Sequence, residues 1–246
     1  MNTHNNTILV TGGGSGIGLE IARLFSERGN TIIITGRNEQ KLKQAVAQLK
    51  NTSYIVSDVS KEADVNKLVA TLEKDHPALN ILINNAGTAS VHNLAEGTDA
   101  FNKASDEILT NYLAPIRLNE KLLPLLKKQS SAAIVTVSSI AAIVPNKVIP
   151  TYSASKAALH SYSQALRISL EKDTAVKVFE LMPPLVNTDF SQEIGGINGI
   201  PPSVVATDLL TAMEQDVYEI HSGLTADFYK LFLSSPAEAL HRLNNR

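Results

Sequence analysis

Tyr152 and Lys156 have the side-chain types and the spacing for acid–base chemistry. They lie four residues apart in the segment Tyr-Ser-Ala-Ser-Lys, so they share one face if the segment is helical. A phenol with an ordinary pKa of about 10 exchanges its proton poorly near neutral pH. An ammonium group on the same face would stabilise the phenolate and lower that pKa. The pair predicts a proton-transfer site, although the chain has six tyrosines and a chance pair on a helix surface is the alternative.

A glycine-rich segment, TGGGSGIG from Thr11 to Gly18, could hold a phosphate. Its spacing is G-x-x-x-G-x-G at Gly12, Gly16 and Gly18. Glycine permits a positive φ in a tight turn and lets backbone N–H groups approach an anion, and a helix that begins there adds a favourable dipole. The alternative is a flexible turn. The position between the first strand-like run and the first helix-like run favours a dinucleotide-binding loop.

The residues after the second strand-like run distinguish between two dinucleotides. An NAD site usually has a carboxylate here for the ribose 2′-hydroxyl, whereas an arginine accommodates the 2′-phosphate of NADP. The chain reads Thr35-Gly36-Arg37-Asn38, with no acid before Glu39. Arg37 could hold a phosphate through two hydrogen bonds. We expect NADP(H) to be favoured over NAD(H), with an exposed loop arginine as the alternative.

Polar residues also follow three other strand-like runs. Asp58 comes after the third run, the segment Asn84–Gly87 (Asn-Asn-Ala-Gly) ends the fourth, and Ser138 and Ser139 follow the fifth. Each is uninformative alone, because such residues are common in turns. The carboxyl ends of parallel strands meet at one edge of a sheet, and ligands bind at that edge. The shared location of these residues therefore predicts a site there.

Strand-like and helix-like segments alternate along the chain. The strand-like runs, the last of them weak, are Thr7–Thr11, Thr31–Thr35, Tyr54–Val56, Asn80–Asn84, Ala132–Val137, Val176–Met182 and Val217–Ile220. Runs that are apolar on both faces are typical of parallel strands covered by helices on both sides. Right-handed crossovers then give a doubly wound sheet. We expect an α/β fold, a Rossmann-like parallel sheet of about seven strands with helices on both faces, rather than a TIM barrel of eight units.

No linker, repeat or block of charge divides the chain. We therefore expect residues 1–246 to form a single dinucleotide-binding catalytic domain. A long helix-like region runs from Asp99 to about Lys128. The irregular stretch 189–203, with three Gly and two Pro, predicts a loop on the substrate side, and a helical extension is expected over 223–246.

The composition argues against several classes of partner and site. The 246 residues include 22 basic and 24 acidic side chains, and this balance argues against nucleic acid or an anionic membrane as a partner. The absence of cysteine excludes disulfides, thiolate metal sites and a cysteine nucleophile. No apolar stretch approaches the ~18 residues that span a bilayer. We recognise no targeting signal and expect a cytoplasmic protein.

Two further kinds of catalytic site have little support. The histidines lie far apart, without a metal-binding spacing, so we expect surface side chains and no metal site: His4, His76, His92, His160, His221 and His241. A serine hydrolase would need the motif G-x-S-x-G. The glycine-rich segment contains Ser15, but Ile17 occupies the position of the last glycine in that motif.

Together these motifs resemble those of the short-chain dehydrogenase/reductase family. Within that family, the chain is most similar to the single-domain branch, which includes bacterial oxidoreductases. The likeness runs from about Thr7 to Thr188, and Ser139 lies thirteen residues before Tyr152, which is the family's spacing for its catalytic serine. By this resemblance the catalytic residues are Asn111, Ser139, Tyr152 and Lys156. The cofactor-binding residues are Gly12, Ser15, Gly16, Ile17, Gly18, Arg37, Asp58, Val59, Asn85, Ala86, Gly87, Tyr152, Lys156, Pro183, Val186 and Thr188.

The resemblance implies a role for each catalytic residue. Tyr152 would donate a proton to a carbonyl oxygen as the nicotinamide delivers hydride, and Ser139 would orient that oxygen. Lys156 would bind the nicotinamide ribose and lower the pKa of Tyr152, and Asn111 would hold a water molecule that connects Lys156 to solvent. We expect an NADP(H)-dependent oxidoreductase for a small carbonyl or alcohol substrate. The alternative is a catalytically weak NADP(H)-binding regulatory or interaction protein on the same fold.

The sequence departs from the family after the sixth strand-like run. Pro183-Pro184 stands where Pro-Gly is usual, which removes a backbone donor beside the nicotinamide position. Beyond Thr188 the glycine-rich final strand that many relatives use in tetramer contacts is absent. We therefore expect a homodimer through the helices that contain Asn111 and Tyr152.

The sequence leaves the substrate and the direction of the reaction open. Apolar residues follow Ser139, and others occur in the irregular loop: Ile140, Ala141, Ala142, Ile143, Val144, Ile194, Ile197 and Ile200. They form either an apolar substrate pocket or part of the core.

Overall fold

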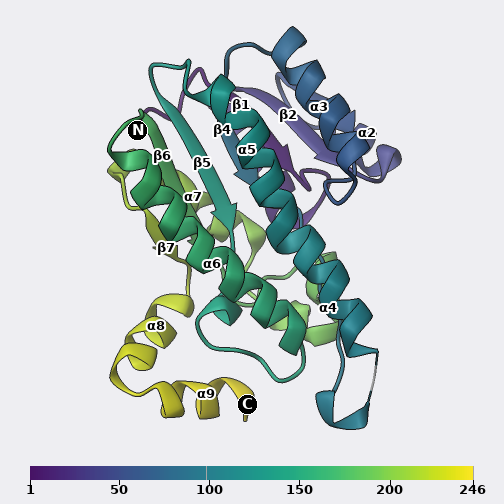
Figure 1. Cartoon of the computed structure of the whole chain (residues 1–246), viewed down its shortest axis with the longest axis vertical. Helices are drawn as coiled ribbons and strands as arrows, with labels where there is room; N and C mark the ends of the chain where they lie inside the picture. The colour runs from purple at the N-terminus through teal and green to yellow at the C-terminus, as the bar shows by residue number, and fades with distance from the viewer. Residues whose placement is uncertain (98, 246) are drawn as a thin grey trace.

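The computed structural model describes residues 1–97 and 99–245, which contain one seven-stranded parallel sheet. Its strands are β1 (Thr7–Thr11), β2 (Thr31–Gly36), β3 (Thr52–Val56), β4 (Leu79–Asn84), β5 (Ala132–Val137), β6 (Val176–Met182) and β7 (Glu219–His221). Their spatial order is β3-β2-β1-β4-β5-β6-β7. The expected doubly wound α/β fold is confirmed (Figure 1).

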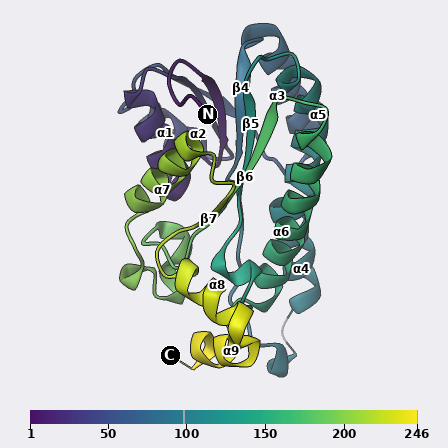
Figure 2. The same cartoon turned by 90° about the vertical axis from the view of Figure 1, so that its left-hand side faces the viewer.

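Helices cover both faces of the sheet (Figure 2). One layer contains α1 (Gly16–Glu27), α2 (Glu39–Val46) and α7 (Pro202–Gln215), and the other contains α3 (Glu62–Asp75), α5 (Ala114–Leu126) and α6 (Pro150–Glu171). Successive side chains of β1 point into opposite layers, so Ile8, Leu9 and Val10 are all fully buried. In the described part of the chain, none of the helices is long and apolar enough to cross a membrane.

The order of the strands reverses at β1. β1 pairs with β2 on one side and with β4 on the other. Crossovers leave such a point in opposite directions, which opens a crevice at the carboxyl ends of the strands where ligands bind. The glycine-rich segment after β1 and Asn85 after β4 both lie at this position.

Several elements differ from the sequence-based expectation; β3, for example, begins at Thr52, two residues earlier than expected. The helical region from Asp99 is interrupted: α4 (Ala100–Ile108) is followed by a π-helical turn over Leu109–Leu113, and α5 begins after it. Pro115 follows directly and has no N–H to donate to the preceding turn, which favours such an irregularity. The last strand begins at Glu219, two residues later than expected, because Val217 N–H donates to Ala212 O and closes the end of α7.

The C-terminal stretch forms two helices at the carboxyl edge of the sheet, α8 (Thr225–Ser234) and α9 (Pro236–Asn244), both visible in Figure 2. Phe228 of α8 packs with Ile140 and Met182, which follow β5 and end β6. Asn244 joins α9 to the loop before α6, because its Oδ1 accepts from Lys147 N–H at 2.7 Å. These helices therefore form a wall beside the strand ends.

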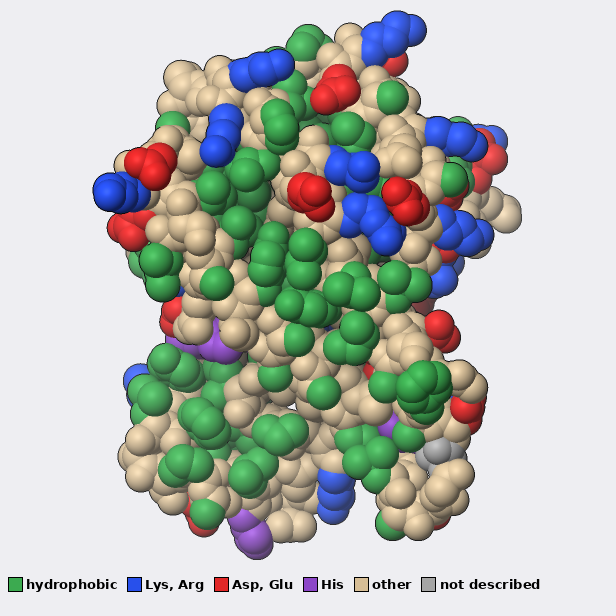
Figure 3. All heavy atoms as spheres, viewed as in Figure 1, with side chains coloured by type: hydrophobic (Ala, Val, Ile, Leu, Met, Phe, Trp, Pro, Cys, Tyr) green, Lys and Arg blue, Asp and Glu red, His purple; other side chains and the backbone are tan. Residues whose placement is uncertain are grey.

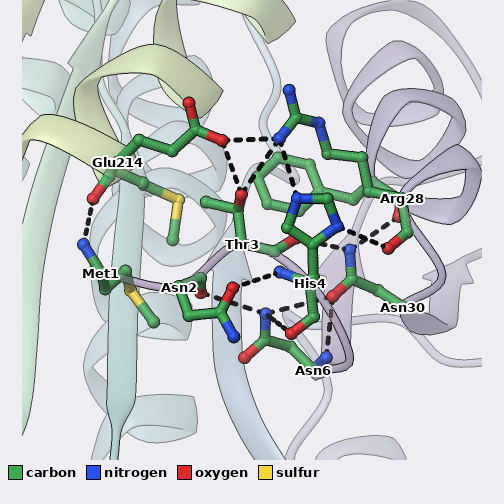
Figure 4. Close-up of polar contacts among 10 residues, drawn as sticks. Met1, Asn2, Thr3, His4, Asn6, Arg28, Asn30 and Glu214 are labelled. Atoms are coloured by element: carbon green, nitrogen blue, oxygen red, sulfur yellow. Dashed lines mark hydrogen bonds and ion pairs between the residues drawn. The ribbon is translucent and has the colours of Figure 1, made fainter.

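A polar cluster fixes the N-terminal residues to the end of α7 (Figure 4). Thr3 and Arg28 both donate to the carboxylate of Glu214. The amino group of Met1 forms an ion pair with Asp216 at 2.9 Å. These contacts connect the segment before β1 to α7, and α1 and α7 pack together in the same layer.

Candidate active site

The glycine-rich segment leaves β1 in a conformation that requires glycine. Gly12 and Gly16 have φ angles of +65° and +56°, where a side chain is strained. A Cβ on Gly18 would lie 2.5 Å from the carbonyl oxygen of Gly12. The three glycines of the predicted motif therefore make the tight turn and let α1 pack closely against it.

α1 begins at this turn with its first N–H groups free of side-chain caps. Ser15 occupies the N-cap position, but its side chain makes no capping hydrogen bond, and the first turn of the helix has no acidic side chain. Ser15, Gly16 and Ile17 line a cavity at the strand ends. N-terminal amides and the helix dipole favour an anion at such a place.

The segment after β4 is tied to the glycine turn. Asn85 Nδ2 donates to the carbonyl oxygens of Thr11 at 2.9 Å and Gly12 at 3.2 Å. Thr11 Oγ1 in turn accepts from the N–H groups of Asn85 and Ala86. Asn85 and Ala86 therefore hold the two sides of the crevice together, and both line the cavity.

Charged side chains lie at the outer end of the cavity, beyond β2 and β3. Arg37, Lys41 and Asp58 all line it, and Arg37 is exposed. Burial acts to raise the pKa of Asp58, but hydrogen bonds from Ser60 and the charges of Arg37 and Lys61 have the larger combined effect and lower it. This end of the cavity therefore contains both a carboxylate and a guanidinium group. Val59, next in the chain, is buried and also lines it.

Tyr152, Lys156 and Ser139 meet at the carboxyl edge of β5. Tyr152 and Lys156 lie near the start of α6, and Lys156 Nζ is 5.6 Å from the centre of the Tyr152 ring. Ser139 caps the short helical turn after β5, and its Oγ accepts from Ala141 N–H at 3.1 Å. All three side chains are buried and line the cavity. The structure thus brings together the three residues that the sequence indicated.

The pKa values of this group follow from burial. Burial raises the pKa of Tyr152 to about 12; the Ser139 side chain opposes this rise, and the charge of Glu107 adds to it. Burial lowers the pKa of Lys156 to about 8, against the opposing charge of Glu180. The pKa of Tyr152 is therefore above its ordinary value, and not below it as expected from the nearby Lys156, because burial is the dominant effect. At neutral pH the phenol is protonated, the form that a proton donor requires, and most of Lys156 is charged.

Asn111 lies in the π-helical turn and is fully buried. Its Oδ1 accepts from Thr88 N–H at 2.8 Å, and its Nδ2 donates to Thr88 O and to Ser155 Oγ. A Cβ on Gly87 would lie 3.2 Å from Asn111 Oδ1 and 3.8 Å from Lys156 Nζ, so both side chains approach the same glycine. Asn111 therefore fixes the segment after β4 beside Lys156, at a π turn of the kind often found at functional sites.

The segment after β6 closes the cavity from the other side. Pro183 O accepts from Ile140 N–H at 2.9 Å, so the Pro-Pro sequence keeps this backbone contact. Val186 forms an isolated parallel bridge with Ile200. Thr188 packs over the glycine turn, because a Cβ on Gly16 would lie 3.1 Å from its methyl group.

The cavity has a volume of about 610 Å³, in the range of sites for cofactors and small molecules. Of the residues predicted from the sequence, all line it except Gly18 and Asn111, which lie directly behind its walls.

Sequence reasoning left the apolar residues after Ser139 and in the irregular loop open between pocket and core, and both alternatives occur. Ile140 and Ile194 line the cavity. Val144 is buried in the cluster below α8 and α9, and Ile197 is exposed.

Sequence reasoning missed several residues that line the cavity and one that is buried outside its lining. Phe190, whose ring centre lies 6.1 Å from that of Tyr152, could have been found in the predicted loop, as could Lys41 in the helix after Arg37. Leu243 reaches the cavity from α9, and no sequence pattern connects it to residues a hundred positions earlier. Glu107 is fully buried on α4, where its Oε1 accepts from Ser90 N–H, although acids on helices are usually exposed.

The expectation that every histidine lies on the surface is wrong for His92. His92 is buried, with its Nδ1 bonded to Ser90 O at 2.9 Å. His160 lies 2.8 Å from the buried carboxylate of Glu180. Within residues 1–97 and 99–245, no group of three or more His, Cys, Asp or Glu side chains could hold a metal ion.

The chain is similar in sequence to known oxidoreductases and in fold to solved short chain dehydrogenases. The sequence profile of the short chain dehydrogenase family matches residues 6–199. The uncharacterized oxidoreductase DltE of Bacillus subtilis (strain 168) is 44% identical over 193 residues, 78% of this chain and 76% of that protein. An uncharacterized oxidoreductase of Staphylococcus aureus (strain MRSA252) is 32% identical over 212 residues, 84% of this chain and 90% of that protein.

A solved structure has the same fold over nearly the whole chain. The short chain dehydrogenase from Burkholderia cenocepacia J2315, in complex with NADP, superposes with a TM-score of 0.86 over 99% of both chains at 25% identity. A short chain dehydrogenase/reductase from Burkholderia phymatum in complex with NAD, at 22% identity and a TM-score of 0.82 over 89% of each chain, supports the fold alone. On the family profile, the two relatives and the shared fold, this chain belongs to the short chain dehydrogenase family.

Proposed function

We propose that the protein is an NADP(H)-dependent oxidoreductase that interconverts a small carbonyl compound and its alcohol. The observation that carries this proposal is the convergence of Ser139, Tyr152 and Lys156 on one cavity with the glycine turn of α1. A proton donor and a site for a dinucleotide phosphate then lie in the same 610 Å³ space. The relatives' description as oxidoreductases supports the same class of reaction.

The residues present fit a nicotinamide dinucleotide. The N-terminus of α1 offers N–H groups without a side-chain cap. In the turn before it, a Cβ on Gly12 or Gly18 would meet other atoms within 3.0 Å, so glycine is required there. Such a turn lets the backbone N–H groups approach a phosphate. Arg37, with Lys41 beside it, would bind a 2′-phosphate, and Asp58 and Val59 would meet the adenine. Gly87, Pro183, Val186 and Thr188 would surround the nicotinamide end.

When bound, the cofactor supplies or accepts a hydride at its nicotinamide ring. For reduction, Tyr152 donates its phenolic proton to the carbonyl oxygen, since its raised pKa keeps it protonated at neutral pH. Ser139 Oγ donates a hydrogen bond to the same oxygen and orients the carbonyl group. Lys156 binds the nicotinamide ribose and stabilises the phenolate left on Tyr152, and Asn111 holds a water molecule through which the proton is restored.

Apolar side chains line part of the cavity. The residues there are Ile140, Ile149, Leu185, Phe190, Ile194 and Leu243. Burying apolar groups of a substrate against them is favourable. We therefore infer a carbonyl compound with an apolar substituent.

The first prediction concerns this activity. Purified protein is expected to oxidise NADPH in the presence of apolar ketones or aldehydes, measured by absorbance across a panel of such compounds. The alternative, a regulatory protein that binds NADP(H) without turnover, predicts saturable NADPH binding and no oxidation with any compound. The intact set of Ser139, Tyr152 and Lys156 favours the enzyme.

The second prediction concerns the segment 189–203, which we propose is a substrate-side lid. It contains two short 3₁₀ turns, Asp189–Ile194 and Gly196–Asn198, and exposes Phe190 and Ile197, while its last two residues already belong to α7. Substrate and NADPH together are expected to slow hydrogen exchange of its amides more than NADPH alone, because an apolar ligand covers these side chains. Equal exchange rates in the two states would argue against a lid.

We further propose a homodimer built on α4, α5 and α6, and a cytoplasmic location where reduced NADPH is available. Hydrophobic side chains gather over α5 and α6 on the face shown in Figure 3. Phe101, Leu113 and Ile168, from α4, the π turn and α6, are exposed large hydrophobic residues. Such a patch is typical of an interface.

A further inference from the structure

Glu180 is a fully buried carboxylate on β6, and it connects three elements of the fold. Its Oε1 accepts from Ser138 Oγ at 2.5 Å, and its Oε2 lies 2.8 Å from Nδ1 of His160. Ser138 follows β5, and His160 lies on α6. A buried carboxylate needs polar partners that compensate for its lost hydration. Ser138 and His160 provide these partners for Glu180.

Two of these elements also carry catalytic side chains: Ser139 follows β5, and Tyr152 and Lys156 lie on α6. Ser138 directly precedes Ser139, and His160 lies one helical turn after Lys156. Lys156 Nζ donates at 2.7 Å to the carbonyl oxygen of Val137, the residue before Ser138. The charge of Glu180 also acts on Lys156, where it opposes the effect of burial on the pKa. The sheet register pairs Glu180 with Thr136 of β5, next to the Val137 carbonyl that Lys156 contacts, and a carboxylate in this position favours the charged form of Lys156.

We propose that Glu180 is a positioning residue of the active site, which holds Lys156 in its charged ammonium form and is itself held in place by Ser138 and His160. This inference rests on the proposed function, in which the Lys156 ammonium binds the cofactor ribose and stabilises the Tyr152 phenolate. Glu180 acts through Lys156 and does not touch the reacting atoms.

The other charges near this cluster are balanced locally. His160 also faces Glu219 of β7 and Arg167 of α6, and His221 of β7 lies in the field of Glu180. Arg167 binds Glu219 at 3.0 Å, so that carboxylate has a permanent partner.

His160, by contrast, can lose its charge. The hydrogen bond to Glu180 raises the pKa of His160 against an opposing effect of burial, but the imidazole becomes neutral once the pH exceeds that pKa. Above that pH, His160 no longer offsets the negative charge of Glu180, and this charge acts mainly on Lys156. The counter-charge is thus strongest in the alkaline range, where Lys156 would otherwise lose its proton.

The direct test is the titration of Lys156 Nζ, followed by ¹⁵N NMR in the Tyr152→Phe protein so that the phenol does not titrate in parallel. Glu180→Gln keeps the shape of the side chain and removes its charge. We expect the pKa of Lys156 to fall by about one pH unit. Glu219→Gln is the matched control, since it removes a carboxylate that faces His160 but is paired with Arg167, and it is expected to leave the titration unchanged.

The functional readout is NADPH affinity as a function of pH, from the fluorescence of the bound cofactor. The alkaline midpoint at which affinity falls is expected to move about one pH unit lower in Glu180→Gln and to stay in place in Glu219→Gln. If NADPH binds but the two variants share the wild-type midpoint, and Lys156 titrates alike in all three, Glu180 is a structural residue only. If NADPH binds at no pH, the proposed cofactor fails, and the NMR titration still decides the role of Glu180.

A second pair of variants covers the case in which Glu180→Gln does not fold. His160→Arg places a permanent cation beside Glu180, whereas His160→Asn keeps a donor without charge, and the His160 side chain is partly exposed. Lys156 is expected to titrate at lower pH in the Arg variant than in the Asn variant. Equal titrations in this pair would overturn the proposal.

Discussion

Tyr152→Phe is expected to lower kcat for carbonyl reduction by about 10²–10⁴-fold, because positioned proton transfer contributes effects of that size. The variant removes a single hydroxyl oxygen from a buried side chain that lines the cavity. The ring contact with Phe190 and the neighbouring Lys156 remain. Steady-state kinetics with NADPH and the best compound of the panel give the measurement.

The control for this result is NADPH affinity, which is expected to change by less than about threefold, since most of the proposed cofactor contacts, those of the glycine turn, Arg37 and Lys156, remain. Tyr54→Phe is the matched substitution: its hydroxyl contacts Glu39 at 3.1 Å on the surface, and turnover is expected to stay at the wild-type rate. A Tyr152→Phe protein that binds NADPH and turns over at more than about a tenth of the wild-type rate would show that another group donates the proton.

The sheet could be predicted because its strands obey strong local patterns. Runs such as Ile32, Ile33 and Ile34 in β2 are buried on both faces, and only a sheet between two helical layers permits this. The π turn before α5 was not predictable to the same degree. A helix-compatible sequence runs through Asn111, and the change in hydrogen bonding over five residues leaves no periodic signature.

The cofactor end of the site could be predicted for a similar reason, since Gly12, Gly16 and Gly18 follow steric rules that the backbone imposes. The pKa of Tyr152 could not. Spacing places Lys156 near the phenol, but it does not reveal the burial that dominates the pKa values of both groups.

Contacts between segments that are distant in the sequence could not be predicted either. Glu180 looks like one acid in an apolar strand, and His160 looks like a surface residue of a helix, until β6 and α6 pack together. Leu243 and Asn244 likewise acquire a role only when α9 reaches the loop before α6.

Arg37→Asp is expected to weaken NADPH binding by about 10–100-fold, the range that corresponds to the loss of hydrogen bonds to a charged group. NADH, which has no 2′-phosphate, is expected to lose less than about threefold, so the ratio of the two affinities falls. The new carboxylate would also stand near Asp58, where the positive charge of Arg37 now lowers the pKa of the acid. Titration calorimetry with each cofactor gives both affinities.

Two further variants identify the cause of the change. Arg23→Asp reverses a charge outside the cavity, on a side chain paired with Glu20 and Glu27, and is expected to leave the NADPH-to-NADH ratio unchanged. Lys41→Asp tests the second cation that lines this end. If Lys41→Asp reduces NADPH affinity selectively and Arg37→Asp reduces both cofactors equally, the 2′-phosphate is bound by Lys41. If Arg37→Asp weakens NADPH binding selectively, the guanidinium group determines the choice of cofactor. Its N–H donors can form two parallel hydrogen bonds with the oxygens of a 2′-phosphate, whereas a 2′-hydroxyl offers no such pair of acceptors.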